Sequence, residues 1–332
     1  MRRIGALLCL TSVISAPSLL LLGCHGSMGK DTGEDSAVET GDCPGSTGWS
    51  SVAAGWLLTC GVHDDGCAEC WGLEGLVVGE TGDAGSYTDY GEDSPPADSF
   101  VSLSLVGGST NGFGNQACGV REDATLACWG RDDDGQAQAP DGSYLSVGVT
   151  AGASCALSVD GSIHCWGLVP APIPSEAKYV ALSVGFSSGM AIDRTGGIEV
   201  FDLWGYFDPY TRAGPFVAGA DGAFICAIRS DQSLYCWSDG DKAKGLLGIT
   251  VPDGQFYSVC VSSPQAFACA IGADGYPICF GQSEVTPTSI LDAPETPLIQ
   301  VSCGANHACG VTPDHNIVCW GDTSHGQGTA PP

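Results

Sequence analysis

Residues 155–167, CALSVDGSIHCWG, decide the fold of this chain. Two cysteines lie ten residues apart, an Asp-Gly pair lies midway between them, and Trp-Gly follows the second cysteine. Tight hairpins favour glycine and aspartate in the turn, because both residues tolerate the backbone angles that the turn requires. The stretch therefore predicts two antiparallel strands in which Cys155 and Cys165 face each other.

The same pattern recurs along the chain in seven copies. In one copy the cysteine positions hold Met190 and Val200, and the spacing is kept. In each copy an aromatic residue follows the second position. The complete pairs are Cys60 with Cys70, Cys118 with Cys128, Cys155 with Cys165, Cys226 with Cys236, Cys269 with Cys279, and Cys309 with Cys319.

Disulfide bonds are the expected state of these six pairs. Facing residues in an antiparallel pair have Cα atoms about 4.5 or 5.5 Å apart, within the roughly 4.4–6.8 Å that a disulfide spans. Buried free thiols and a metal site are the alternatives. A metal site would favour sulfurs two to four residues apart with a second such pair, and Cys67 and Cys70 have this spacing without that second pair. Each of these disulfides would stabilise the folded chain by about 2–3 kcal/mol.

Four further cysteines lie outside the pattern. Cys43 precedes the repeats and Cys67 falls in the first hairpin turn, so a bond between them would hold the N-terminal segment against the first repeat. Cys260 and Cys303 lie on the first strands of successive repeats. We expect both pairings, although sequence alone does not fix disulfide connectivity.

The repeat period predicts the architecture. The first-cysteine position advances by 58, 37, 35, 36, 43 and 40 residues. A period near 35–45 residues with four short strands per repeat is typical of a β-propeller. The chain is therefore expected to be all-β, with a seven-bladed propeller over 49–332 and an acidic loop insertion at 73–99.

The N-terminal segment has the features of an export signal. Arg2 and Arg3 precede an apolar run that ends in Leu-Leu-Gly-Cys24, and this ending resembles the lipobox of bacterial lipoproteins. The resemblance implies a signal peptide at 1–23, cleavage before Cys24 and lipidation of its sulfur. An uncleaved membrane anchor is the alternative. An exported chain meets oxidising conditions, which agrees with disulfide formation.

Residues 24–48 are polar and acidic, and we expect them to form a flexible tether. The whole chain has 38 acidic and 11 basic residues and a formal net charge of −27. Such a charge repels nucleic acids and anionic lipid headgroups, so the only membrane contact expected is the lipid anchor. It favours solubility or a basic protein partner.

The repeated elements together resemble the regulator of chromosome condensation repeat family, in particular exported bacterial members with paired cysteines. They are a strand of small residues, a cysteine-bearing strand, an Asp-Gly turn, Cys-Trp-Gly, and Gly-Gln segments such as Gly135-Gln136 and Gly326-Gln327. The resemblance covers residue 49 to the C-terminus. It implies a seven-bladed propeller that binds proteins through loops at one face. The guanine nucleotide exchange of the founding member is not expected for an exported chain.

Three aromatic residues are candidates for binding: Trp56, Phe113 and Phe186. Each falls in the turn between the first and second strands, where exposed aromatic side chains would anchor a partner. The alternative is that they fill the gap between blades. His307 has the strand position that Phe267 has in another repeat, which favours a packed core histidine.

No cofactor or metal site is expected, and acidic clusters such as Asp132-Asp133-Asp134 lack the ligand spacing of a calcium loop. The sequence also contains no nucleophile elbow or phosphate-binding loop. We therefore expect a non-enzymatic binding or scaffolding protein of the bacterial cell envelope, at the outer membrane or cell surface. The alternatives are a carbohydrate-active or other enzyme with a site at the channel mouth, and a protein inhibitor of the secreted type.

Overall fold

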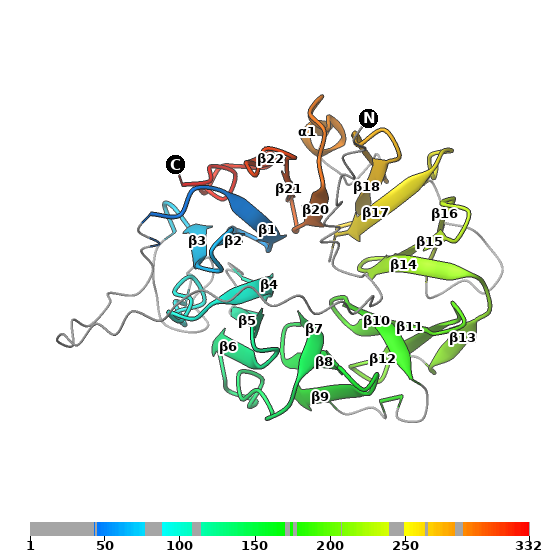
Figure 1. Ribbon diagram of the computed structural model, residues 1–332, viewed down its shortest axis with the longest axis horizontal. Helices are drawn as coiled ribbons and strands as arrows, with labels where there is room; N and C mark the ends of the chain where they lie inside the picture. The colour runs from blue at the N-terminus through cyan, green and yellow to red at the C-terminus, as the bar shows by residue number, and fades with distance from the viewer. Residues whose placement is uncertain are drawn as a thin grey trace, which may run out of the picture.

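Seven antiparallel sheets are arranged in a ring around a central axis, as blades of a propeller (Figure 1). The computed structural model describes residues 43, 45–76, 88–107, 114–169, 173–174, 178–206, 208–238, 249–262, 265–282 and 288–331. The predicted signal peptide, Cys24 and most of the predicted tether lie outside the described residues. Among the helices that are described, none is long and apolar enough to cross a membrane.

Each blade is built from three consecutive strands, and the first strand is innermost in the ring (Figure 1). The first strands are β1 (Trp49–Ala54), β4 (Phe100–Val106), β7 (Tyr144–Val149), β10 (Tyr179–Val184), β14 (Phe216–Asp221), β17 (Phe256–Val261) and β20 (Gln300–Cys303). The second strands are β2 (Leu58–His63), β5 (Gln116–Arg121), β8 (Ala153–Ser158), β11 (Ser188–Asp193), β15 (Ile225–Arg229), β18 (Phe267–Gly272) and β21 (His307–Val311). The third strands are β3 (Ala68–Gly72), β6 (Leu126–Gly130), β9 (Ile163–Gly167), β12 (Ile198–Asp202), β16 (Leu234–Trp237), β19 (Pro277–Gly281) and β22 (Ile317–Gly321).

The repeated cysteines face each other across the second and third strands, and all six predicted hairpin disulfides are present. Gly161 in the turn between Cys155 and Cys165 has a φ of +90°. In the fourth blade Met190 and Val200 face each other at the same register position. The seven copies of the sequence pattern are thus seven equivalent hairpins. The bonds join Cys60 to Cys70, Cys118 to Cys128, Cys155 to Cys165, Cys226 to Cys236, Cys269 to Cys279 and Cys309 to Cys319, with Cα atoms 4.0–4.1 Å apart.

The two additional disulfides also form. Cys43 is bonded to Cys67, which attaches the segment before the first blade to the first hairpin turn. Cys260 is bonded to Cys303, and this bond joins the inner strands β17 and β20 of adjacent blades. The described residues therefore contain eight disulfides, which indicates a protein that matures in an oxidising compartment outside the cytoplasm.

The expectation of four strands per blade is wrong for six of the seven blades in the described part of the chain. Only the fourth blade has a fourth strand, β13 (Tyr210–Arg212), paired with β12. In the first, second, third and seventh blades, a segment outside the sheet is hydrogen-bonded to blade side chains instead. For example, the carbonyl oxygen of Gln136 accepts hydrogen bonds from Trp166 Nε1 (2.8 Å) and Ser154 Oγ (3.0 Å). These bonds hold the linker near the blade without forming a ladder.

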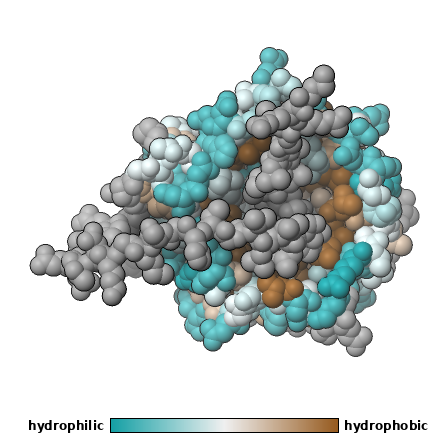
Figure 2. Space-filling model, viewed as in Figure 1, coloured by the Kyte–Doolittle hydropathy of each residue, from teal (hydrophilic) through white to brown (hydrophobic). Residues whose placement is uncertain are grey.

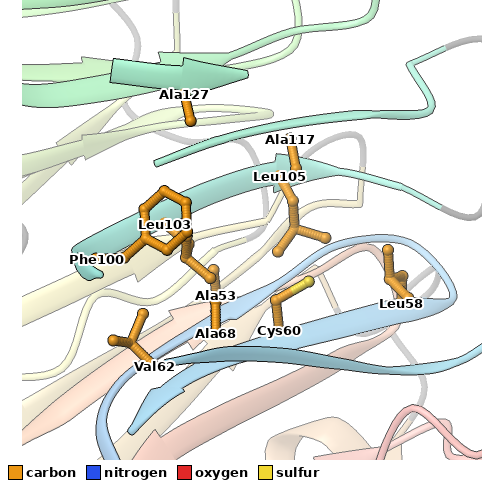
Figure 3. Close-up of a cluster of buried hydrophobic side chains, with 10 residues drawn as sticks. All are labelled: Ala53, Leu58, Cys60, Val62, Ala68, Phe100, Leu103, Leu105, Ala117 and Ala127. Atoms are coloured by element: carbon orange, nitrogen blue, oxygen red, sulfur yellow. The ribbon is translucent and has the colours of Figure 1, made fainter. Parts of the chain in front are cut away.

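The hydrophobic core is divided among the seven blade interfaces. One cluster of buried side chains lies between each pair of adjacent blades, including the last and the first. Figure 3 shows the cluster between the first two blades, where Cys60 and Val62 of β2 lie opposite Leu103 and Leu105 of β4. Both faces of each blade are thus buried, which explains why the half-cystine and the aromatic residue after it can project to opposite sides.

The ring closes by contact between the seventh blade and the first. Gln300 Oε1 accepts from Val52 N at 2.9 Å, and Ser302 Oγ accepts from Ala54 N at 3.0 Å. At the outer end of the same interface, Trp49 N donates to the carbonyl oxygen of His315 at 2.8 Å. Side chains on β20 thus take the place of a shared strand in sealing the propeller.

Small residues on the inner strands allow this close approach around the axis. A Cβ atom at Gly148 of β7 would lie 2.6 Å from Cβ of Val184 on the neighbouring β10. A contact this short cannot be relieved without moving one inner strand, because both atoms are attached directly to the backbone. Glycine at this position therefore sets the spacing between two blades.

Candidate binding face at the mouth of the central channel

The inner strands enclose a cavity of about 200 Å³ on the propeller axis. It is lined by the later residues of the seven first strands and by the turns that follow them, including those with Trp56 and Phe186. The residues that line it are mostly aliphatic or small. Asp221 is the one carboxylate among the described lining residues, and its Oδ1 accepts a hydrogen bond from Ser188 Oγ at 3.1 Å.

The turns after the first strands and those of the cysteine hairpins lie at opposite ends of the second strand. The two kinds of turn therefore lie on opposite faces of the disc. We call the face with Trp56 and Phe186 the mouth face, and the face with the Asp-Gly turns the hairpin face. On the side of the disc shown in Figure 2, hydrophilic residues dominate the circumference and hydrophobic residues gather nearer the centre.

Trp56 and Phe186 are half-buried on the mouth face, so neither of the two predicted environments describes them fully. Both residues line the cavity. The backbone N–H of Trp56 donates to the carbonyl oxygen of Gly107 in the second blade at 2.8 Å. Phe113, the third predicted aromatic, lies outside the described residues.

Phe186 begins a row of three aromatic side chains. Its ring lies 6.3 Å from that of Trp204 with an interplanar angle of 7°, and Trp204 lies 6.4 Å from Tyr206 with an angle of 6°. Trp204 is held in place because its Nε1 donates to the carbonyl oxygen of Phe186 at 3.2 Å. Tyr206 is 74% exposed. The row thus runs from the cavity edge to a solvent-exposed ring.

The fourth blade owes this row to its departure from the repeated pattern. Phe201 has the position that a tryptophan has in most other blades, and after β12 the chain continues as Leu203-Trp204-Gly205-Tyr206, which adds two further aromatic residues. Gly205 has a φ of +82° with open space around it, so the loop can turn outward there. Sequence reasoning missed Trp204 and Tyr206, although the aromatic cluster in residues 204–210 was an available signal.

The hairpin face has a different character. An aspartate lies in each of the seven hairpin turns, and several carboxylates accept hydrogen bonds within their own turn. A hydrogen bond from the Ser162 side chain and one from its backbone lower the pKa of Asp160 to about 2. Hydrogen bonds from Thr125 and Ser233 likewise lower the pKa values of Asp123 and Asp231. This face therefore carries a ring of aspartates, of which Asp123, Asp160 and Asp231 are held ionised at neutral pH.

Exposed aliphatic residues lie inside this ring of acids. Val101, Leu145 and Val217 are 47–53% exposed, and each is the second residue of a first strand. At this position the pairing with the second strand shifts register, so the residue forms a β-bulge. A bulge turns its extra residue out of the ladder, which explains the exposure. The sequence pattern gave no sign of the bulges.

His307 is a fully buried residue at the interface between the last and first blades, as expected. Its Nε2 lies 2.8 Å from Thr59 Oγ1. Burial lowers its pKa to about 4. It is not among the residues that line the cavity and has no place in the candidate site.

One group of potential metal ligands lies near the N-terminal end of the propeller. Cys43, His63 and Glu69 place their ligand atoms within 4.8 Å of one another. The Cys43 sulfur is bonded to Cys67, and a disulfide sulfur lacks the thiolate charge that a metal requires. His63 is instead stacked on Trp49, with ring centroids 3.7 Å apart, and lies 3.3 Å from Glu69.

Comparison with known proteins agrees with this geometry. Residues 298–327, which include β20, β21 and β22, match the regulator of chromosome condensation (RCC1) repeat. Prp20p from Saccharomyces cerevisiae has a similar structure, with a TM-score of 0.57 and 15% identity over 86% of this chain and 85% of that one. This chain has the fold of an RCC1-type propeller.

Other propellers show how widely this fold is shared. The ectodomain of the Arabidopsis thaliana receptor kinase ACR4 aligns with a TM-score of 0.59 and 18% identity, over 82% of this RCC1-type propeller and 97% of the ectodomain. Human WBSCR16 aligns with a TM-score of 0.57 and 13% identity, over 80% and 87% of the two chains. At these identities the likeness is one of fold.

Proposed function

We propose that this chain is a non-enzymatic protein-binding scaffold of the bacterial cell envelope that engages a basic partner through its mouth face. The observation that carries the proposal is the aromatic row Phe186–Trp204–Tyr206. Aromatic side chains are enriched among the residues that contribute most to interface affinity, because they bury much area at a small entropy cost. Tyr206, at 74% exposed, is available for such burial.

The charge of the chain supports a basic partner. The net charge is −27, and a field of this size speeds association with positively charged surfaces and opposes association with nucleic acids. The faces of the aromatic rings also attract Arg and Lys side chains through cation–π interaction. An aromatic row on a strongly acidic protein therefore favours a surface that presents Arg or Lys.

Protein binding has precedent on this fold. The structure of yeast Prp20p was described together with its binding properties to Gsp1p and histones. That precedent concerns the use of the scaffold and does not transfer a partner or an exchange activity to this chain. Within the described lining of the cavity, a single hydrogen-bonded carboxylate provides little support for acid–base catalysis.

The envelope location rests on two features. Eight disulfides favour an oxidising compartment, and Cys24 follows an apolar run in the manner of a lipoprotein. The substitution Cys24→Ser would test the anchor. Incorporation of a labelled fatty acid should occur in the wild type and be lost in the variant, with release of the protein from the membrane fraction.

The binding proposal can be tested by crosslinking the protein to its neighbours in envelope extracts. A Phe186→Ala/Tyr206→Ala variant should lose the crosslinked partner. Tyr276→Ala is the matched control, because Tyr276 is a 43% exposed tyrosine on the hairpin face. Equal capture by wild type, double variant and control would contradict a binding role for the mouth face.

A further inference from the structure

Two arginines share one aromatic ring at the boundary between the fourth and fifth blades. The guanidinium carbon of Arg212 lies 5.3 Å from the ring centroid of Tyr235, and that of Arg229 lies 4.6 Å from the same centroid. Arg212 also lies over Trp237 at 4.6 Å, and its Nη1 donates to the Tyr235 hydroxyl at 3.2 Å. We call Arg212, Arg229 and Tyr235 the arginine pair site.

The fourth strand of the fourth blade creates this arrangement. Arg212 is the last residue of β13, the strand that only this blade has in the described part of the chain. Arg229 ends β15 in the next blade, and Tyr235 lies on β16. Both arginines lie at the hairpin end of their strands, because Arg212 pairs with Ile198 directly after one hairpin turn and Arg229 precedes the next.

Of the six described lysine and arginine residues, Arg212 and Arg229 are two of the three that form no ion pair, and the third, Arg194, is exposed in a hairpin turn. The other three lie within ion-pair distance of an aspartate. These pairs are Arg121–Asp98 at 2.8 Å, Arg131–Asp133 at 2.7 Å and Lys178–Asp160 at 3.6 Å.

Neither Arg212 nor Arg229 has such a partner within the described residues. Arg229 lies near enough to Asp231 to help lower the pKa of that aspartate. The Asp231 carboxylate accepts a hydrogen bond from Ser233 and forms no ion pair with Arg229. In its described part, a chain with 38 acidic residues thus leaves two neighbouring guanidinium groups outside ion-pair distance of a carboxylate.

The Nε atom of Arg212 adds a second observation. It is buried and has no hydrogen-bond acceptor in the described part of the structure. A buried donor without an acceptor destabilises the fold, and more so when the group is charged. An acceptor supplied from outside would recover this cost, and an anion would also reduce the repulsion between the two guanidinium groups.

We propose that the arginine pair site binds an oxyanion, a phosphate or carboxylate group of an acidic ligand. Guanidinium groups bind both kinds of oxyanion through paired N–H···O bonds. Contact with the Tyr235 ring restricts the two side chains, so less rotamer entropy is lost on binding. The site lies on the hairpin face, opposite the aromatic row, and is independent of the basic partner proposed for that row.

A purely structural role for the arginines, as cation–π contacts that hold the fifth blade against the fourth, makes a different prediction. In that case their removal would lower stability, and no anion would bind. The two roles are separated by measuring anion binding and thermal stability on the same variants.

Isothermal titration of the full-length protein with pyrophosphate and, separately, with the tricarboxylate tricarballylate tests the proposal. The wild type should bind at least one probe, and the probe that binds identifies the oxyanion chemistry. Arg212→Gln and Arg229→Gln should each weaken binding at least tenfold. Lys178→Gln removes the same charge from an exposed position elsewhere on the hairpin face and should bind as the wild type does.

A conservative variant keeps the test valid if Arg212→Gln does not fold. Arg212→Lys keeps the charge and loses the planar fork, so it should retain most of the thermal stability and bind the probe several-fold more weakly. Absence of binding of both probes to the folded wild type would overturn the proposal. So would an equal loss of binding in Lys178→Gln, because binding would then depend on net charge alone.

Discussion

The indole N–H of Trp71 in the first blade donates to the carbonyl oxygen of Gln327, close to the C-terminus, at 3.0 Å. The same relationship recurs around the ring, where a tryptophan on a third strand is bonded to the linker that precedes its own blade. The other pairs are Trp129 with Glu92, Trp166 with Gln136 and Trp320 with Ile290. For the first blade the C-terminal segment takes the place of that linker.

Removal of this segment should therefore destabilise the first blade. Gln327 is fully buried, and its carbonyl oxygen also accepts from Thr59 Oγ1 at 2.9 Å. Deletion of residues 323–332 leaves two buried donors without this acceptor, at a cost of about 2–5 kcal/mol. Urea denaturation should show a lower midpoint, and deletion of Pro331 and Pro332 alone should leave it unchanged. Equal midpoints for the two truncations would contradict this account of ring closure.

The buried His307 predicts a loss of stability in mild acid. Burial lowers its pKa to about 4, whereas an unfolded histidine has a pKa of about 6.5. Between these values the unfolded state binds more protons, so the free energy of unfolding falls as the pH drops from about 6.5 towards 4. At pH 4.5 the loss should be roughly 2–3 kcal/mol relative to pH 7.

The substitution His307→Phe isolates this contribution. Phe267 has the equivalent strand position in the sixth blade and is fully buried there, so phenylalanine suits the site. Urea midpoints measured at pH 7 and pH 4.5 should differ less in the variant than in the wild type. The same pH dependence in both proteins would assign the acid sensitivity to other groups.

The fourth blade should accept a seventh hairpin disulfide. Met190 and Val200 face each other at the register position that the cysteines have in the other blades. In Met190→Cys/Val200→Cys the two thiols should oxidise, and the closed loop should contribute about 2–3 kcal/mol, less the cost of the smaller side chains. Mass spectrometry of unreduced peptides checks the bond. A denaturation midpoint that does not fall on reduction of this bond would show that the engineered disulfide does not stabilise the fold.

The hairpin turn should tolerate no side chain at Gly161. The residue has a φ of +90°, and a Cβ atom there would lie 2.9 Å from the carbonyl oxygen of Tyr179. We expect Gly161→Ala to lower stability by about 1–3 kcal/mol through strain and the clash together. Gly205→Ala is the control, because Gly205 has a φ of +82° but nothing within 4 Å of the position that a Cβ atom would take. Thermal denaturation of the two variants gives the comparison, and equal losses would leave backbone strain as the only cause.

Much of the fold was predictable because residues close together in the sequence specify each hairpin. The cysteine spacing, the Asp-Gly turn and the repeat period identified seven hairpins and six disulfides, since facing residues in a tight hairpin are fixed by their distance from the turn. The pairings of Cys43 with Cys67 and of Cys260 with Cys303 were also expected, and the structure contains both. The fourth strand was predicted for every blade and, in the described part of the chain, occurs only in the fourth. In the first, second, third and seventh blades a segment hydrogen-bonded to a tryptophan takes its place.

The candidate sites were much harder to predict from the sequence. Trp56 and Phe186 were named from their turn positions, but Trp204 and Tyr206 complete the row only because the loop after β12 folds back over the preceding turn. Arg212 and Arg229 were not singled out at all. They meet at Tyr235 because two adjacent blades pack edge to edge.

By itself, the sequence determined a chain of seven equivalent hairpins, since each hairpin is specified by residues within about a dozen positions of one another. The tertiary structure decided how the ring closes, which carbonyl oxygen each tryptophan binds, and which side chains of different blades lie together. These features depend on contacts between residues as far apart as Trp71 and Gln327. Such contacts arise from the packing of whole blades, and no local pattern encodes them.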